Sequence, residues 1–239
     1  MIEQFYRKVP EKFKSESGAV FNSGRSAFNK PSPLYILGLN PGGDPEKHKI
    51  ETLDFHTSKV LNRPEDWSEF RDEPWNRRKP GTTGMQPRIL HMFKGLNLEL
   101  HQVPASNVIF RRTSGEKQLA GAFDQLAEQC WEFHHEVIEQ LGVKVIVCFG
   151  GTAGTWVKRR LGAREKVGEF VETNNRGWRS EAFRNSQGIA VVSVSHPSRA
   201  AWQNFAADPT PLVFSALTSA VDTATAKSSL VRVHFHEAD

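Results

Sequence analysis

Two carboxamides and one imidazole accompany the short apolar runs of this 239-residue chain. Asn40 directly follows the first run, Asn107 lies inside the second, and His196 follows the last with one serine between. Short apolar runs bounded by Pro, Gly and polar residues are typical of buried strands. In a parallel sheet the strands end at one edge, where ligands bind, so these three side chains are expected to meet in one crevice.

The first of these residues belongs to a stiff turn, Asn40-Pro41-Gly42-Gly43. Pro41 fixes its own φ angle and biases Asn40 towards an extended conformation, and the glycines permit close approach of the backbone. Taken singly, each feature also has a plain structural explanation. The turn could be an ordinary connection, Asn107 a satisfied buried amide, and His196 the first residue of a helix. Only their combination indicates a site.

The composition indicates the kind of binding partner and the kind of cellular compartment to expect. Lys and Arg exceed Asp and Glu by four and the pI is about 9.1, which permits a polyanion such as DNA as the partner. Two cysteines, Cys130 and Cys148, are too few for a disulfide framework and indicate a reducing compartment. The first residues resemble no signal peptide and no run approaches 18 apolar residues, so we expect a cytoplasmic monomer without membrane contact.

Strands that alternate with helices predict an α/β protein, a three-layer α/β/α fold around a central, mainly parallel four-stranded sheet. We expect a single domain over 1–239, with a lead-in at 1–33, an insertion at 43–85 and a tail strand at 225–239. The predicted core strands are 34–39, 105–110, 143–149 and 189–194, the peripheral strands 169–173 and 179–184, and the helices 54–61, 64–70, 87–98, 118–141, 152–161, 197–206 and 210–224.

Two motifs carry a resemblance to a known family. Gly-Leu-Asn-Pro-Gly at 38–42, followed far downstream by His-Pro-Ser at 196–198, resembles the signature motifs of the uracil-DNA glycosylase superfamily. The strand with Asn107 and the apolar strand at 144–150 resemble the central part of that superfamily. The resemblance covers 34–42 and 105–206.

The resemblance implies a role for each matched residue. Asn40 falls where the superfamily positions the attacking water, and an Asn there orients the water without acting as a base. His196 falls where a histidine donates a hydrogen bond to the pyrimidine O2 as charge develops on the leaving base. Asn107 falls where an Asn reads the edge of the flipped base, with Gly38 and Leu39 beside it.

The resemblance also implies contacts with DNA. Ser198 and neighbouring backbone N–H groups are expected to hold phosphates at a helix start. Arg199 and Trp202 fall in the loop that enters the duplex when the base leaves it, so either is a candidate wedge. Arg111 and Arg112, in the basic loop after the second strand, are expected to contact the DNA backbone.

The chain departs from the superfamily pattern at two places. Gly42 stands where some members have a Tyr that excludes C5-substituted bases, so that side of the base is open here. The branch with an iron–sulfur cluster needs four cysteines, and only Cys130 lies at a comparable position, so no cluster and no other cofactor or metal is expected. The aromatic that stacks on the base is not identified; the candidates are Phe55, Trp75 and Met85.

The expected function is a monofunctional DNA glycosylase acting on uracil or on a C5-modified pyrimidine, since no lysine lies in either motif. A hypermodified cytosine of viral DNA, in a defence role, is one form of this hypothesis. The alternative is a catalytically inactive nucleic-acid-binding relative of the same fold. The glycine-rich stretch 149–154 lacks the spacing of a dinucleotide-binding turn, and the histidine pairs 134–135 and 234–236 are interpreted as surface residues rather than metal ligands.

Overall fold

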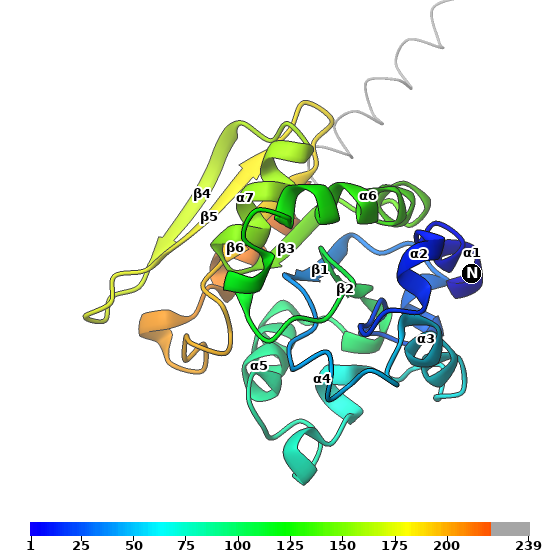
Figure 1. Cartoon of the computed structure of the whole chain (residues 1–239). Helices are drawn as coiled ribbons and strands as arrows, with labels where there is room; N and C mark the ends of the chain where they lie inside the picture. Colours follow the sequence, from blue (N-terminus) through cyan, green and yellow to red (C-terminus); the bar gives the residue numbers. More distant parts are fainter. Residues whose placement is uncertain (221–239) are drawn as a thin grey trace, which may run out of the picture.

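The four core strands lie side by side and parallel, as predicted. They are β1 (Leu34–Gly38), β2 (Ala105–Asn107), β3 (Val145–Phe149) and β6 (Ala190–Val194), in the order β2-β1-β3-β6. The computed structural model describes residues 1–220, so the predicted tail strand at 225–239 lies outside the described residues. The carboxyl ends of all four strands meet at one edge of the sheet (Figure 1).

Among residues 1–220 the sheet has six strands, so the predicted number of four was too small. The two peripheral strands, β4 (Glu165–Val171) and β5 (Arg179–Arg184), form an antiparallel hairpin. β5 pairs with the outer edge of β6 and thereby joins the hairpin to the parallel sheet. A free edge of backbone N–H and C=O groups accepts another strand readily, which is why the hairpin extends this sheet.

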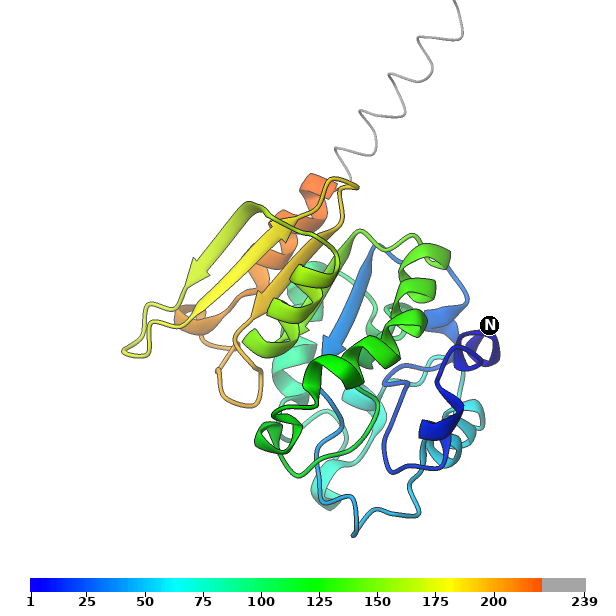
Figure 2. The ribbon, with the colours of Figure 1, turned by 45° about the horizontal axis from the view of Figure 1, so that its top comes forward.

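Both faces of the sheet are covered, which confirms the three-layer α/β/α architecture. Side chains of β3 alternate: Ile146 and Cys148 belong to one hydrophobic cluster, and Val145, Val147 and Phe149 to the other. Figure 2 shows α6 (Phe123–Gln140) and α7 (Gly151–Arg160) in front of the sheet and α5 (Gln86–Leu96) behind it. The rear layer also includes a helix at 210–220. Elsewhere in the described chain there are shorter helices: α1 (Ile2–Tyr6), α2 (Glu11–Lys14), η1 (Arg25–Phe28), α3 (Leu53–Leu61), α4 (Glu69–Asp72), η2 (Trp75–Arg77) and η3 (Leu100–Gln102).

Three helix predictions were wrong at their boundaries. The helix expected at 64–70 is only the short α4, which begins at Glu69, because Ser68 and the residues before it have an extended or turn backbone. The long helix α6 begins at Phe123 and not at residue 118, because a separate 3-10 turn, η4 (Glu116–Leu119), precedes it. The segment 197–206 forms turns and only the start of η5 (Phe205–Ala207), because its backbone and side chains bond to the histidine before it and to the core. Within residues 1–220 no helix is long and apolar enough to cross a membrane.

His134 on α6 is buried, which corrects its interpretation as a surface residue. Tyr35 Oη lies 2.8 Å from His134 Nδ1, and His134 Nε2 lies 3.2 Å from the carbonyl oxygen of Val108. Since the carbonyl can only accept, Nε2 carries the proton and Nδ1 accepts from the tyrosine. Burial lowers the pKa of His134 to about 4.

We expect His134 to make the fold acid-sensitive. Between pH 6.5 and 4 the unfolded chain protonates this histidine while the folded chain does not, so its contribution is complete above about pH 6.5 and is lost as pH falls towards 4. A shift of this size corresponds to about 3 kcal/mol. Urea unfolding at pH 7.5 and pH 4.5 measures the loss. In His134→Gln, which keeps one donor and one acceptor, the loss should be smaller by that amount; an equal loss would contradict the prediction.

Candidate active site

The turn after β1 fixes the amide of Asn40 in one orientation. Its Nδ2 group donates hydrogen bonds to Pro41 O at 3.0 Å, to Thr113 Oγ1 at 2.8 Å and to Arg111 O at 3.3 Å. The two carbonyl partners can only accept, so a flipped amide would bring oxygen against oxygen. The Oδ1 atom has no donor among residues 1–220, and it is the atom that can accept a hydrogen bond from a water molecule.

The second carboxamide, Asn107, lies beside β1. The strands pair so that Gly38 is opposite Asn107, and a Cβ atom at position 38 would collide with Asn107 Oδ1. Glycine at position 38 is therefore what lets this amide lie over the first strand. Asn107 is only 8% exposed, and none of the described residues bonds to its side chain. Its amide atoms are not among the enclosed unpartnered atoms of the described residues, so they keep access to solvent and can bond a ligand in the cavity.

His196 is held as a neutral hydrogen-bond donor. The backbone N–H of Ser198 lies 3.1 Å from His196 Nδ1 and the Ser198 hydroxyl lies 2.7 Å from it. A backbone N–H can only donate, so Nδ1 is the acceptor and the ring proton sits on Nε2. Burial lowers the pKa of His196, and the positive charge of Arg199 lowers it further, against a smaller opposing effect of Glu116. A neutral imidazole with its N–H available is the result.

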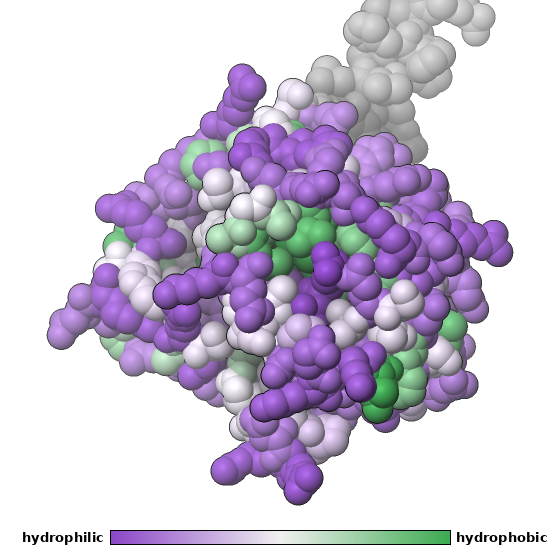
Figure 3. All heavy atoms as spheres, viewed as in Figure 1, coloured by the Kyte–Doolittle hydropathy of each residue, from purple (hydrophilic) through white to green (hydrophobic). Residues whose placement is uncertain are grey.

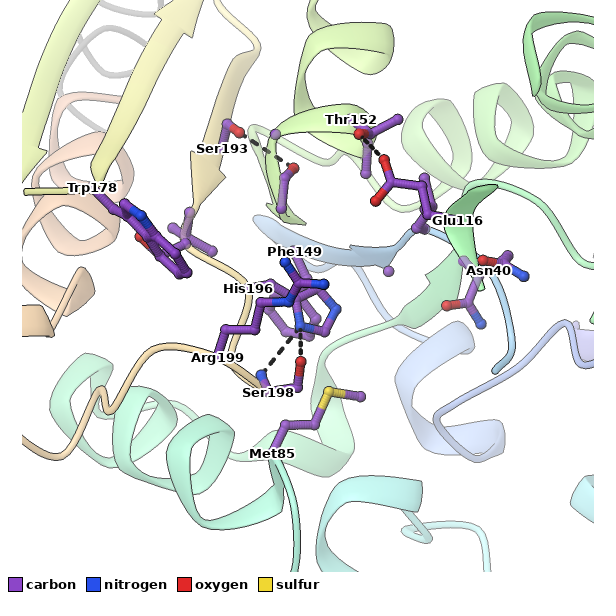
Figure 4. A pocket seen from close by; sticks show the side chains of 18 of the residues that line it. Asn40, Met85, Glu116, Phe149, Thr152, Trp178, Ser193, His196, Ser198 and Arg199 are labelled. Carbon is purple, nitrogen blue, oxygen red and sulfur yellow. Dashed lines mark hydrogen bonds between the residues drawn. The ribbon is translucent and has the colours of Figure 1, made fainter. Parts of the chain in front are cut away.

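All three side chains line one cavity of about 560 Å³ at the carboxyl edge of the sheet. Figure 4 shows Asn40 and Glu116 on one side of it, Trp178 on the other, and His196 with Arg199 between them. Figure 3 shows a hydrophobic hollow over β1 and β3, ringed by hydrophilic side chains. The structure thus brings together the residues whose convergence was expected, with Gly38 and Leu39 in the same wall.

Gly42 lies on a second cavity, of about 750 Å³, that shares Asn40, Met85 and Asn107 with the first. A Cβ atom at Gly42 would meet nothing within 4 Å, so the space beside this residue is open. The remaining wall of the second cavity comes largely from the insertion 43–85. The long insertion therefore enlarges the site on the side of Gly42.

The second cavity carries polar groups without partners. Four of its buried polar atoms have no hydrogen bond within residues 1–220: Asn22 Oδ1, His56 Nδ1, Arg63 Nε and Trp67 Nε1. Burial, and next the charge of Glu73, raise the pKa of Glu69 to about 7, so this carboxyl group is partly protonated at neutral pH. The four unpaired atoms are closed off from the cavity as well as from solvent, so they lie behind its wall and a ligand reaches them only if side chains of the wall move.

The structure revises the roles expected for Trp202 and Arg112 and adds a role for Ser198. Trp202 is fully buried, and its Nε1 donates to Ser195 O at 3.1 Å, so it belongs to the core and cannot enter a duplex. The N–H and hydroxyl of Ser198 both bond to His196 Nδ1, so this exposed residue positions the histidine, and its contact with a phosphate stays a prediction. The side chain of Arg112 is 12% exposed and donates to Gly42 O at 2.6 Å, so it holds the turn.

For two arginines, Arg199 and Arg111, contact with the DNA backbone stays a prediction. Arg199 is exposed at the mouth of the first cavity, without an ion pair among the described residues. Arg111 is 42% exposed but pairs with Glu16, which reduces the positive charge it offers to DNA. Contact with phosphate would have to compete with that pair.

The structure adds residues that the motifs did not identify. Phe149, at the end of β3, lies in the wall of the first cavity with its ring 6.5 Å from that of His196. Glu116 and Trp178 also line this cavity. Of the candidate stacking residues, Met85 lines both cavities, and Phe55 and Trp75 line only the second. The apolar run had indicated a buried strand, but not that its last side chain would reach the site.

Comparison with known families gives the class of protein. The family model of the uracil DNA glycosylase superfamily matches residues 26–217, which include every strand of the described sheet, the whole lining of the first cavity and all of the second cavity's lining except Ala19 and Asn22. The chain belongs to the uracil DNA glycosylase superfamily. A search of curated proteins found no match.

Proposed function

We propose that the chain is a monofunctional DNA glycosylase that flips a pyrimidine nucleotide and hydrolyses its N-glycosidic bond, leaving an abasic site. The observation that carries the proposal is the neutral His196, which presents Nε2–H to the cavity that Asn40 and Asn107 also line. A preorganised donor of this kind stabilises charge that develops in the transition state. No lysine among the described residues lines this cavity, which supports simple hydrolysis over a Schiff-base lyase step.

In the proposed mechanism the bond between the sugar C1′ and the base nitrogen breaks first. Its electron pair moves to the base, where His196 Nε2–H donates to O2 and stabilises the negative charge. The sugar becomes a cation, and a water held by Asn40 Oδ1 adds at C1′ and loses its proton to solvent. Asn40 needs only to orient this water, because a cationic carbon requires little nucleophilic assistance. Asn107 holds the edge of the base during these steps.

We propose further that the substrate is a pyrimidine with a polar C5 substituent, rather than uracil alone. The support is the second cavity, which opens beside Gly42 and has polar residues such as His48, Glu69 and Arg112 in its lining. A hydroxyl-bearing group both donates and accepts, so it suits a cavity lined by donors and acceptors. A hypermodified cytosine of viral DNA is a base of this class, and its removal would serve defence.

A panel of duplexes that differ at a single pyrimidine tests the proposal. The position carries uracil, thymine, 5-hydroxymethylcytosine or a glycosylated 5-hydroxymethylcytosine, and mass spectrometry measures the released base. We expect release of at least one hydroxyl-bearing base at a rate above that of thymine. Release of uracil alone would contradict the C5 assignment, and binding without any release would favour the inactive relative.

A substitution in the second cavity distinguishes recognition of the C5 substituent from recognition of the base itself. Glu69→Gln keeps the size of the side chain and removes its partial charge. It should change the rate on the hydroxyl-bearing base several-fold and leave the rate on uracil unchanged, because only the substituent reaches this cavity. Equal effects on both substrates would show that Glu69 acts on the base or on the fold.

A further inference from the structure

The tip of the β4–β5 hairpin lies at the same edge of the sheet as the site. β6 runs towards His196, and β5 is antiparallel to β6, so β5 begins where β6 ends. The connection between the two hairpin strands, residues 172–178, is therefore next to the loop that follows His196. Figures 1 and 2 show this connection projecting beyond the rest of the molecule. Trp178 at its end lines the first cavity.

A buried carboxylate anchors this connection to the loop. The side chain of Glu172 is 0% exposed, and its Oε2 accepts hydrogen bonds from Arg176 Nη2 at 2.7 Å and Asn174 Nδ2 at 2.8 Å. The other amino group of Arg176, Nη1, donates to Arg199 O at 2.5 Å. Arg176 thus ties the hairpin to the loop that the motif places against DNA.

Trp178 is held on one side and open on the other. The guanidinium of Arg176 lies 4.4 Å from the centroid of the indole ring. The residue is nevertheless 38% exposed, and Figure 4 shows its ring at the wall of the cavity, on the side of Arg199. An exposed indole that is stacked on a fixed cation is presented rigidly, with little side-chain entropy left to lose on binding.

We infer that Trp178, backed by Arg176, is a stacking platform for the DNA base next to the flipped nucleotide. The inference rests on the proposed function, because only a flipped nucleotide leaves its neighbour without a stacking partner. An aromatic ring replaces that partner whatever the neighbouring base is. Arg199, which is exposed and has no ion pair among the described residues, supplies positive charge for a flanking phosphate. This assigns to an exposed residue of the hairpin the role that the buried Trp202 cannot have.

The test compares duplex and single-stranded DNA that carry the same releasable base. Trp178→Ala should lower release from the duplex by about ten- to a hundredfold, the range expected for one base–aromatic stack. Release from the single strand should change less than about threefold, because no base pair has to open. Trp178→Phe should restore most of the duplex activity. Phe214→Ala is the matched control, since Phe214 is 50% exposed and lines neither cavity.

A second readout excludes a merely structural role. With 2-aminopurine beside the target position, the wild-type protein should keep this reporter quenched by stacking, and Trp178→Ala should make it brighter. Equal losses on both DNA forms, or unchanged duplex activity in Trp178→Ala, would overturn the inference. If the wild-type protein releases no base at all, the proposed function fails separately. Duplex affinity and the reporter then still decide the role of Trp178.

Discussion

Base release should fall by about two to three orders of magnitude in His196→Ala, the size of effect seen when one preorganised oxyanion donor is removed. His196 Nε2–H is the group that meets the charge on the leaving base, and alanine offers no substitute. Single-turnover release from a saturating duplex measures the chemical step. DNA affinity, measured by fluorescence anisotropy, should stay within a few-fold of wild type, because the imidazole is half-buried in the cavity wall.

The pH profile and a neighbouring variant test the protonation state in this prediction. Because the pKa of His196 is lowered, the ring stays neutral at pH 7 and release should fall only in more acidic solution, as Nδ1 gains a proton. A protonated Nδ1 can no longer accept the Ser198 N–H. Ser198→Ala keeps that backbone donor and should lose only a few-fold. Activity of His196→Ala within a few-fold of wild type would remove the proposed mechanism.

A large loss of activity is also expected when Asn40, the residue proposed to orient the attacking water, is replaced. Asn40→Ala should also lose orders of magnitude in release rate, because alanine removes the Oδ1 atom that is proposed to hold the attacking water. Asn40→Asp should not gain activity, although a carboxylate is a better base. One carboxylate oxygen would replace Nδ2 and face the carbonyl oxygens of Pro41 and Arg111. A faster Asn40→Asp enzyme would contradict this account of the turn.

Gly42→Tyr should abolish release of any pyrimidine with a bulky C5 group and spare release of uracil. The tyrosine ring would extend into the second cavity, which Gly42 lines, and would occupy space proposed for a large substituent. Discrimination over one methylene is worth only about 1–3 kcal/mol, but a ring that meets a large substituent excludes it much more strongly. Release of each base from matched oligonucleotides is the measurement.

The structure makes this variant informative, because the turn tolerates a side chain. Gly42 does not have a positive φ, and a Cβ atom there meets nothing within 4 Å. Gly42→Ala should therefore behave like wild type on every base and serves as the control for the backbone. A thermal melt checks that Gly42→Tyr remains folded. If the folded variant still releases a bulky base at the full rate, Gly42 does not border the C5 side, and the argument for an enlarged pocket fails.

The sequence by itself determined the layers of the fold and the meeting of the three polar side chains. Apolar runs and helical periodicity are local patterns, and parallel strands must end at one edge, so Asn40, Asn107 and His196 could be brought together without any contact being known. The same reasoning anticipated the peripheral pair of strands. Sequence reasoning did not place this pair beside β6, because that placement depends on which strand forms the open edge of the folded parallel sheet.

Only the tertiary structure decided which motif neighbours face the ligand. Trp202 follows the histidine motif closely, yet the chain turns there and buries the indole against Ser195 O, whereas Trp178 reaches the cavity from a distant hairpin. The second cavity likewise arises where the insertion 43–85 packs beside Gly42. The physical reason is that burial and side-chain direction depend on contacts between segments far apart in the chain, and local spacing does not encode those contacts.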